Sequence, residues 1–348
     1  MLDDPRQIGL IDKGDMLGII SRFANLVESG YKSASSLEAD FSDCNGGLVF
    51  LGLGGSAIGG DIIRDWIGGQ IPDGVRIERG FELSGPIASD SLVICCSYSG
   101  NTRETLSMLG QVVGSKHKNL LIISSDGKLK DIARKKRLHF IQLEPGMPPR
   151  TSLPSVVSAV SVISDSIGWT RKASSEILAA ADACGIFLRK SLGQDVPEPK
   201  NLAKQLAHQI HGFIPVAIAP SCMESVARRW KTQMNENAKQ HCFFGSFPEI
   251  SHNEIVPWQR DARSDALVAL LLKGIGLSEE LEQGFARLES FLRKSARTIS
   301  ISPVGRSKIE VILNHVLIAD FTSTYSAILS KVDPTPVDEI TAFKSEKR

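Results

Sequence analysis

Residues 91–106 read SLVICCSYSGNTRETL and predict a strand, a polar turn and a helix in succession. The apolar run at 92–96 is typical of a parallel strand that is buried on both faces. Residues 97–102 then bring together Ser and Thr hydroxyls and a glycine. Asn101 and Glu104 have the spacing of a capping box, so we expect the helix to begin at this point.

A strand that leads through such a turn into a helix N-terminus can bind an anion. Free backbone N–H groups and the positive end of the helix dipole point into the turn, and Ser and Thr hydroxyls add donors. Phosphate is the anion that suits these donors. An ordinary polar loop between a strand and a helix also favours Ser, Asn and Gly, and the turn by itself does not decide between the two.

The composition predicts a soluble protein of two domains. A chain of 348 residues is long enough for two cores of ordinary size, and 42% hydrophobic and 23% charged residues are globular values. Lys and Arg number 40 against 39 Asp and Glu, a net charge of +1. This balance gives no reason to expect a nucleic acid or a membrane surface as partner.

The cysteines and the first residues favour the cytoplasm. The six cysteines show no C-x-x-C spacing and two lie in the apolar run at 92–96, as expected of reduced core cysteines rather than disulfides or a zinc site. Residues 1–10 carry acids and a proline where a signal peptide has basic residues and then an apolar run. No apolar segment reaches membrane-spanning length.

A second turn with exposed backbone follows the predicted strand at 48–51. Residues 52–61 read GLGGSAIGGD and lead into a helix. This resembles a dinucleotide fingerprint, and the next strand, 75–79, carries an acid at about the distance that such a fingerprint requires. Because dinucleotide folds place their pyrophosphate on the first turn only, the turn at 97–102 favours a sugar-phosphate site shared by both turns.

Apolar runs alternate with helices along the chain, which predicts an α/β protein with two doubly wound parallel-sheet domains. The first domain has five such runs, and the alternation restarts after residue 212 with strands at 214–219, 266–272 and 298–301. We find no second copy of the hydroxyl-rich turn there. The expected boundaries are 1–45 for an N-terminal helical segment, 46–195 and 196–332 for the two domains, and 333–348 for a C-terminal helix.

Three polar residues outside the turns are candidates for the site. Arg150 follows a proline-rich segment that aims it near the strand ends, although it is also consistent with a surface residue on a stiff linker. Glu236 is consistent with a solvated acid at a helix end. Ser251 and Glu254 have capping-box spacing, which predicts His252 on the first turn of a short helix. His208 and His211 are three residues apart but more typical of a structural role than of a metal site.

Six motifs in this order resemble those of the bifunctional phosphoglucose/phosphomannose isomerases, a family of the phosphoglucose isomerase superfamily. They are LGLGGSAIGGD, SYSGNTRET, PPRTSLP, NENAK, PEISHNE and DPTPV, and the resemblance covers roughly residues 45–345. It implies two sugar-isomerase (SIS) domains and a homodimer. It also implies interconversion of glucose 6-phosphate or mannose 6-phosphate with fructose 6-phosphate, without a metal or another cofactor.

The same resemblance implies roles for particular residues. The substrate-binding residues are the glycine turn that lines the sugar and the phosphate cradle: Gly54, Gly55, Ser56, Ser97, Ser99 and Thr102. Arg150 is similar to the arginine that faces the enediolate, and Glu236 to the base that moves a proton between C1 and C2. His252 is similar to a residue that assists ring opening from the partner subunit. Lys344 is similar to a C-terminal lysine that is also tied to ring opening.

Isomerisation of an aldose to a ketose needs one positioned carboxylate and a cation for the developing oxyanion, which Glu236 and Arg150 would supply. The alternative is a regulatory SIS protein that binds a sugar phosphate without catalysis. We expect the enzyme, because Glu236, His252 and Arg150 are all present and no DNA-binding domain is. Amidotransferase relatives that make glucosamine 6-phosphate need an N-terminal cysteine-nucleophile domain, which we do not find.

Overall fold

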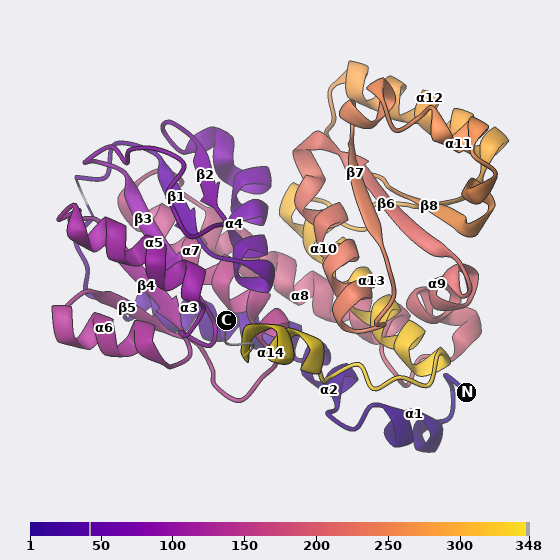
Figure 1. Cartoon of the computed structure of the whole chain (residues 1–348), viewed down its shortest axis with the longest axis horizontal. Coiled ribbons are helices and arrows are strands. Elements are labelled where there is room, and N and C mark those ends of the chain that lie inside the picture. The colour runs from indigo at the N-terminus through magenta and orange to yellow at the C-terminus, as the bar shows by residue number, and fades with distance from the viewer. Residues whose placement is uncertain (42, 346–348) are drawn as a thin grey trace. The chain divides into compact units, whose positions relative to one another are not determined.

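The structure of the chain is a computed structural model that describes residues 1–41 and 43–345 (Figure 1). The chain divides into two compact units by its internal contacts. The first unit comprises residues 22–183 and 307–310, and the second comprises 1–21, 184–306 and 311–348. The domain boundaries expected from the sequence are not tested by this division and stay a prediction.

The first unit contains a five-stranded parallel sheet with the strand order β2-β1-β3-β4-β5. Its strands are β1 (Leu48–Leu51), β2 (Val75–Glu78), β3 (Leu92–Cys96), β4 (Leu120–Ser124) and β5 (His139–Gln142). Its helices are α3 (Phe23–Ser35), α4 (Gly54–Ile67), α5 (Arg103–Gly114), α6 (Lys128–Lys136) and α7 (Leu153–Ile167), with short 3-10 helices η1 (Gly68–Gln70) and η2 (Pro149–Ser152). The five predicted strands are confirmed.

Helices cover both faces of this sheet, which makes it doubly wound. Side chains of α5 and α6, such as Met108 and Leu129, pack with Val93 of β3 and Ile122 of β4 on one face. On the other face Gly60 of α4 lies directly against the ring of Phe50. Strands buried on both faces explain why β1, β3 and β4 are continuous apolar runs.

The second unit contains a four-stranded parallel sheet with the order β7-β6-β8-β9. Its strands are β6 (Ile214–Pro220), β7 (Phe243–Phe247), β8 (Leu267–Leu272) and β9 (Arg297–Ile301). Its helices are α1 (Pro5–Ile11), α2 (Met16–Ser21), α9 (Leu202–Ile210), α10 (Glu224–Glu236), α11 (Pro257–Arg260), α12 (Glu279–Ser295) and α14 (Asp338–Ser345), with 3-10 helices η3 (Glu198–Lys200), η4 (Ser221–Met223), η5 (Glu249–His252) and η6 (Ala262–Ala266). The division between the units falls within α8 (Ala173–Ser191) and near the start of α13 (Lys308–Leu329).

Sequence reasoning found three of these four strands and missed β7. This strand lies at the edge of the sheet and only two of its five residues are buried. Its sequence, FFGSF, therefore has neither a continuous apolar run nor clean alternation. In Figure 1, α11 and α12 lie along one side of this sheet and α10 along the other; Phe285 of α12 packs with Val216 and Leu271.

The N-terminal segment is mostly helical as predicted, and it forms the three helices α1, α2 and α3. Met16, Phe23 and Leu26 are buried. Among the described residues no disulfide joins the six cysteines, and five of them are buried. Within the same part of the chain, no helix combines the length and the apolar character needed to cross a bilayer.

One buried histidine links the pH to stability. His315 of α13 is 1% exposed, and its Nε2 donates to the carbonyl oxygen of Lys273 over 2.8 Å. Burial disfavours the charged ring and lowers the pKa of His315 to about 4 from the ordinary 6.5. The folded protein therefore holds this ring neutral over a range in which the unfolded chain is protonated.

We predict that the free energy of unfolding falls by up to about 3 kcal/mol through this residue as the pH drops from about 6.5 to about 4. His315→Gln keeps an amide donor but cannot titrate, so it should flatten this part of the pH dependence. Urea unfolding at several pH values measures the effect. The exposed His241→Gln serves as the control, and equal slopes in both variants would contradict the assignment.

Candidate active site

The glycine turn after β1 packs directly against Arg150. Gly54 has a φ of +51°, a left-handed conformation that favours glycine, and α4 begins here. A Cβ added at Gly55 would lie 3.1 Å from the Cα of Arg150, so the two backbones are in close contact. The side chain of Ser56 is buried, and its hydroxyl accepts a hydrogen bond from the N–H of Tyr98 over 3.3 Å. The first turn is thus tied to the second.

The turn after β3 holds its hydroxyls close together. The hydroxyls of Ser97 and Thr102 are hydrogen bonded at 2.8 Å, and the hydroxyl of Ser99 accepts from the N–H of Asn101 at 3.3 Å. Gly100 lies at the apex with a φ of +65°. The three predicted phosphate-binding hydroxyls therefore surround one short loop at the start of α5, where the first N–H groups of the helix have no intrahelical acceptor.

The capping box predicted for this helix is wrong. The N-cap of α5 is Thr102, and no side chain of the described residues caps it. The side chain of Asn101 makes other bonds: its amide N–H donates to the carbonyl of Ser99 in the same turn at 3.0 Å, and its amide oxygen accepts from the N–H of Lys128 at 3.2 Å. The bond to Lys128 joins the turn to α6 and uses the side-chain oxygen that a cap of α5 would need.

Tyr98 connects the turn to the segment that carries Arg150. Its hydroxyl donates to the carbonyl of Glu144 over 2.9 Å and accepts from the N–H of Met147 over 2.8 Å. Its own carbonyl accepts from the hydroxyl of Ser125 over 2.6 Å. Sequence reasoning did not single out this residue, although its place between Ser97 and Ser99 in the motif was a signal.

Arg150 is a buried residue of η2. It is 2% exposed, so the alternative of a surface residue on a stiff linker is wrong. Pro149 opens η2, and the hydroxyl of Thr151 donates to the carbonyl of Pro148 over 2.8 Å. The backbone of this buried residue lies against Gly55 of the first turn.

The structure also weakens the dinucleotide interpretation. Glu78, the acid that would bind a ribose, is 5% exposed. Its carboxylate accepts from the hydroxyl of Ser84 at 2.7 Å and pairs with Arg76 at 3.0 Å. The carboxylate of Glu78 is therefore already bonded within the protein rather than directed to a ribose.

Glu236, His252 and Lys344 belong to the second unit, on three different elements. Glu236 is the last residue of α10 and is half-buried. The Nζ of Lys239 donates to the carbonyl of Glu236 over 2.6 Å and to that of Pro334 over 3.1 Å. The motifs NENAK and DPTPV, distant in sequence, therefore meet at the end of α10.

The helix start predicted around His252 is wrong. His252 is the last residue of the 3-10 helix η5, and its side chain is exposed. The hydroxyl of Ser251 donates to the carbonyl of Pro248 over 2.6 Å instead of capping a following turn. Lys344 lies in α14, also exposed. The catalytic roles of both residues stay predictions.

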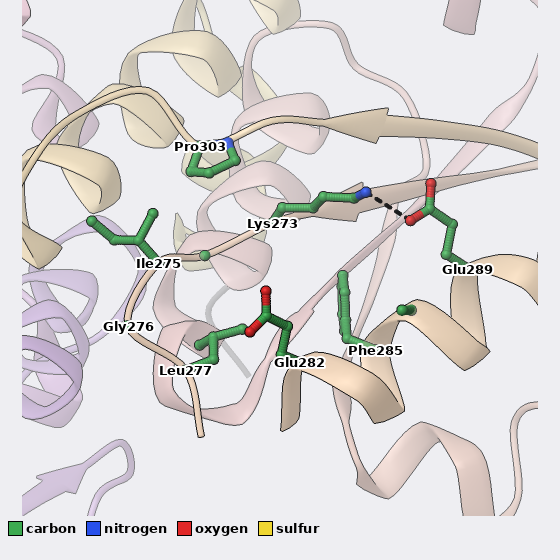
Figure 2. A pocket seen from close by; sticks show the side chains of 10 residues that line it. Lys273, Ile275, Gly276, Leu277, Glu282, Phe285, Glu289 and Pro303 are labelled. Carbon is green, nitrogen blue, oxygen red and sulfur yellow. Dashed lines mark ion pairs between the residues drawn. The ribbon is translucent and has the colours of Figure 1, made fainter. Parts of the chain in front are cut away.

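A cavity of about 540 Å³ lies in the second unit beside the loop after β8 (Figure 2). Lys273 reaches across it to Glu289, with 2.7 Å between Nζ and Oε2, while Glu282, Phe285 and Pro303 contribute other walls. By strand order this loop corresponds to the turn at 97–102 of the first unit. Its residues 274–277 carry no hydroxyl, so the second sheet repeats the fold and not the phosphate-type turn.

Within residues 1–41 and 43–345, no three His, Cys, Asp or Glu side chains form a group that could hold a metal ion.

Comparisons with known proteins find relatives that match over most of the chain. A sequence model described as the bacterial phospho-glucose isomerase C-terminal SIS domain matches residues 199–346. The bifunctional phosphoglucose/phosphomannose isomerase of Caldicellulosiruptor bescii is 31% identical over 304 residues, which cover 86% of this chain and 88% of that protein. The corresponding protein of Aquifex aeolicus is 30% identical, covering 86% and 90%.

The chain belongs to the bifunctional phosphoglucose/phosphomannose isomerase family. The resemblance seen in its motifs is thereby confirmed. A crystal structure of a glucose-6-phosphate isomerase like protein from Thermus thermophilus superposes with a TM-score of 0.63 and 16% identity, covering 98% of both chains. At this identity the superposition supports the fold of the family, two parallel-sheet SIS domains, and nothing finer.

Gly100 offers a test of the turn. A Cβ at Gly100 would collide with the carbonyl oxygen of Asp126, and its φ is left-handed. We expect Gly100→Ala to lower the free energy of unfolding by about 2 kcal/mol or more. Gly110→Ala, in the middle of α5 with nothing within 4 Å of the added Cβ, should raise it by about 0.5–1 kcal/mol. Denaturant unfolding compares the two, and equal effects would contradict the geometry.

Proposed function

We propose that this protein is an aldose–ketose isomerase that interconverts glucose 6-phosphate, mannose 6-phosphate or both with fructose 6-phosphate. Membership of the family supports the reaction class. The observation that carries the proposal within this chain is the joined pair of turns, where Ser97, Ser99 and Thr102 surround an anion-type loop and buried Arg150 lies against Gly55.

The two turns suit a phosphorylated sugar in complementary ways. The hydroxyls of the turn at 97–102 and the first N–H groups of α5 would hold the phosphate, while the open space beside Gly54, where nothing lies within 4 Å of an added Cβ, leaves room for the sugar. Binding energy from the phosphate is remote from the reacting carbons and can hold C1 and C2 in place for proton transfer.

The chemistry needs one base and one cation. The carboxylate of Glu236 takes the proton from C2 of the open-chain aldose; the electrons of that C–H bond form the C1–C2 double bond, and the C1 carbonyl electrons move to O1. Arg150 stabilises the resulting enediolate, so no metal is required for charge. Return of the proton to C1 and transfer of the O2 proton to O1, with formation of the C2 carbonyl, complete the ketose.

His252 and Lys344 would assist ring opening before this step. We propose that the protein is a cytoplasmic homodimer in which His252 acts in the site of the partner subunit. The exposure of the His252 and Lys344 side chains is compatible with such roles.

We expect Glu236→Gln to lower kcat by about 1000-fold while substrate affinity changes little, because the amide keeps the shape of the side chain and removes the base. A coupled assay with glucose 6-phosphate and mannose 6-phosphate, with and without chelator, measures this. Glu279→Gln, an exposed acid of α12, is the control. A near-full rate in Glu236→Gln would refute the choice of base.

Exchange of the C2 hydrogen with deuterated water separates the enzyme from the regulatory alternative. The isomerase should exchange this hydrogen and form product. A regulatory protein would bind fructose 6-phosphate and show neither exchange nor product.

The phosphate role of the turn has its own test. We expect Ser97→Ala to raise KM and the inhibition constant of inorganic phosphate together, each by about tenfold, because it removes a hydroxyl and unpairs Thr102. Ser175→Ala, an exposed serine of α8 far along the chain, is the control. An unchanged inhibition constant would mean that phosphate is bound elsewhere.

A further inference from the structure

One face of α10 forms a polar contact with α13. Arg229 and Asn237 are eight residues apart and therefore lie on the same side of the helix. Arg229 donates to both carboxylate oxygens of Asp320 at 2.8 and 2.7 Å, and the amide of Asn237 donates to the hydroxyl of Ser323 at 2.9 Å. Both partners belong to α13. We call the residues Arg229, Gln233 and Asn237, with their contacts on α13, the polar seam.

Gln233 occupies the middle of the polar seam and is fully buried, with 0% of its surface exposed. Within the described part of the chain, neither its amide oxygen nor its amide nitrogen has a hydrogen-bond partner. An unpaired buried amide costs about 1–3 kcal/mol, whereas Met or Leu would fill a similar volume without this cost. Packing alone therefore does not account for a glutamine here.

Glu236 is the nearest functional candidate to this amide. It follows Gln233 by three residues on α10, which places the two Cβ atoms about 5–6 Å apart. Side chains of a helix lean toward its N-terminus, a direction that brings the side chain of Glu236 toward the turn that carries Gln233. Both side chains are long enough to meet.

The backbone of this turn is held on both sides. Asn237 and Arg229 fix α10 to α13, and Lys239 holds the carbonyl of Glu236 over 2.6 Å. Because the main chain is anchored at this point, a hydrogen bond between Gln233 and Glu236 would form by rotation of the two side chains.

We propose that Gln233 is a positioning residue for the base Glu236. A primary amide offers an N–H to a carboxylate and a C=O to a carboxylic acid, so it can pair with Glu236 in both protonation states of the proton transfer. Hydrogen bonds at active sites often form fully only when the substrate is bound. The inference rests on the proposed function, since it assigns Gln233 a task only if Glu236 is the base.

Gln233→Met removes the amide and keeps the length of the side chain. We expect kcat to fall at least about tenfold with KM within about twofold, because the base loses its orientation and the phosphate grip is untouched. The acid limb of the kcat profile, which reports the substrate complex, should move to higher pH by at least about 0.5 unit, because the charged base loses a donor there. The melting temperature should stay equal or rise.

Thr322→Val is the matched control. Thr322 of α13 is also fully buried, and its hydroxyl has no partner within the described residues. Its loss should likewise maintain or raise the melting temperature, but kcat and the pH profile should not change. A loss of kcat in Thr322→Val equal to that in Gln233→Met would overturn the proposal in favour of a packing effect.

Gln233→Glu keeps the size and polarity of the residue and covers the case in which Gln233→Met does not fold. A second carboxylate beside the base should also move the acid limb to higher pH. An unchanged kcat and acid limb in the folded Gln233 variants would show that Gln233 does not act on the base. If the wild-type protein catalyses no isomerisation, the proposed function fails, and the role of Gln233 fails with it.

Discussion

Every polar group of Tyr98 is bonded to a different part of the first unit. Its N–H donates to Ser56 of the glycine turn, its carbonyl accepts from Ser125 after β4, and its hydroxyl links Glu144 and Met147 ahead of Arg150. The residue itself is buried. Three loops that are far apart in sequence thus share one anchor. The close packing of Gly55 against Arg150 depends on this arrangement, because loops without such bonds would be free to move apart.

The two sheets show why a repeated fold need not repeat a site. Each places a loop after its third strand in chain order, β3 or β8, at the carboxyl edge where open α/β sheets bind ligands. In the first unit this loop carries hydroxyls and a left-handed glycine, whereas in the second it carries Ile275 and Leu277 and borders a cavity crossed by the Lys273–Glu289 ion pair. The topology provides the position, and the side chains decide its chemistry.

Local patterns predicted much of this protein because they follow from burial. The strands β1 and β3, and β4 up to Ile123, are continuous apolar runs, as expected of strands in a sheet covered on both faces. The helix starts were predicted less well. Asn101 and Ser251 both have the residue type of a cap, but each is used by other bonds, Asn101 toward α6 and Ser251 toward Pro248. A spacing rule considers one helix only, whereas Asn101 bonds to Lys128 of another helix and Ser251 bonds backward to the carbonyl of Pro248.

The sequence by itself determined the fold class, the family and the identity of the polar turns, because these depend on hydrophobic period, glycine placement and motifs that are contiguous in the chain. Only the tertiary structure decided that Arg150 is buried, that Glu78 is already paired within the protein, and that Gln233 lies in the polar seam without a partner among the described residues. Burial and pairing are properties of contacts between distant segments. No local sequence pattern predicts them, because Arg, Glu and Gln are also common on the solvent-exposed surface.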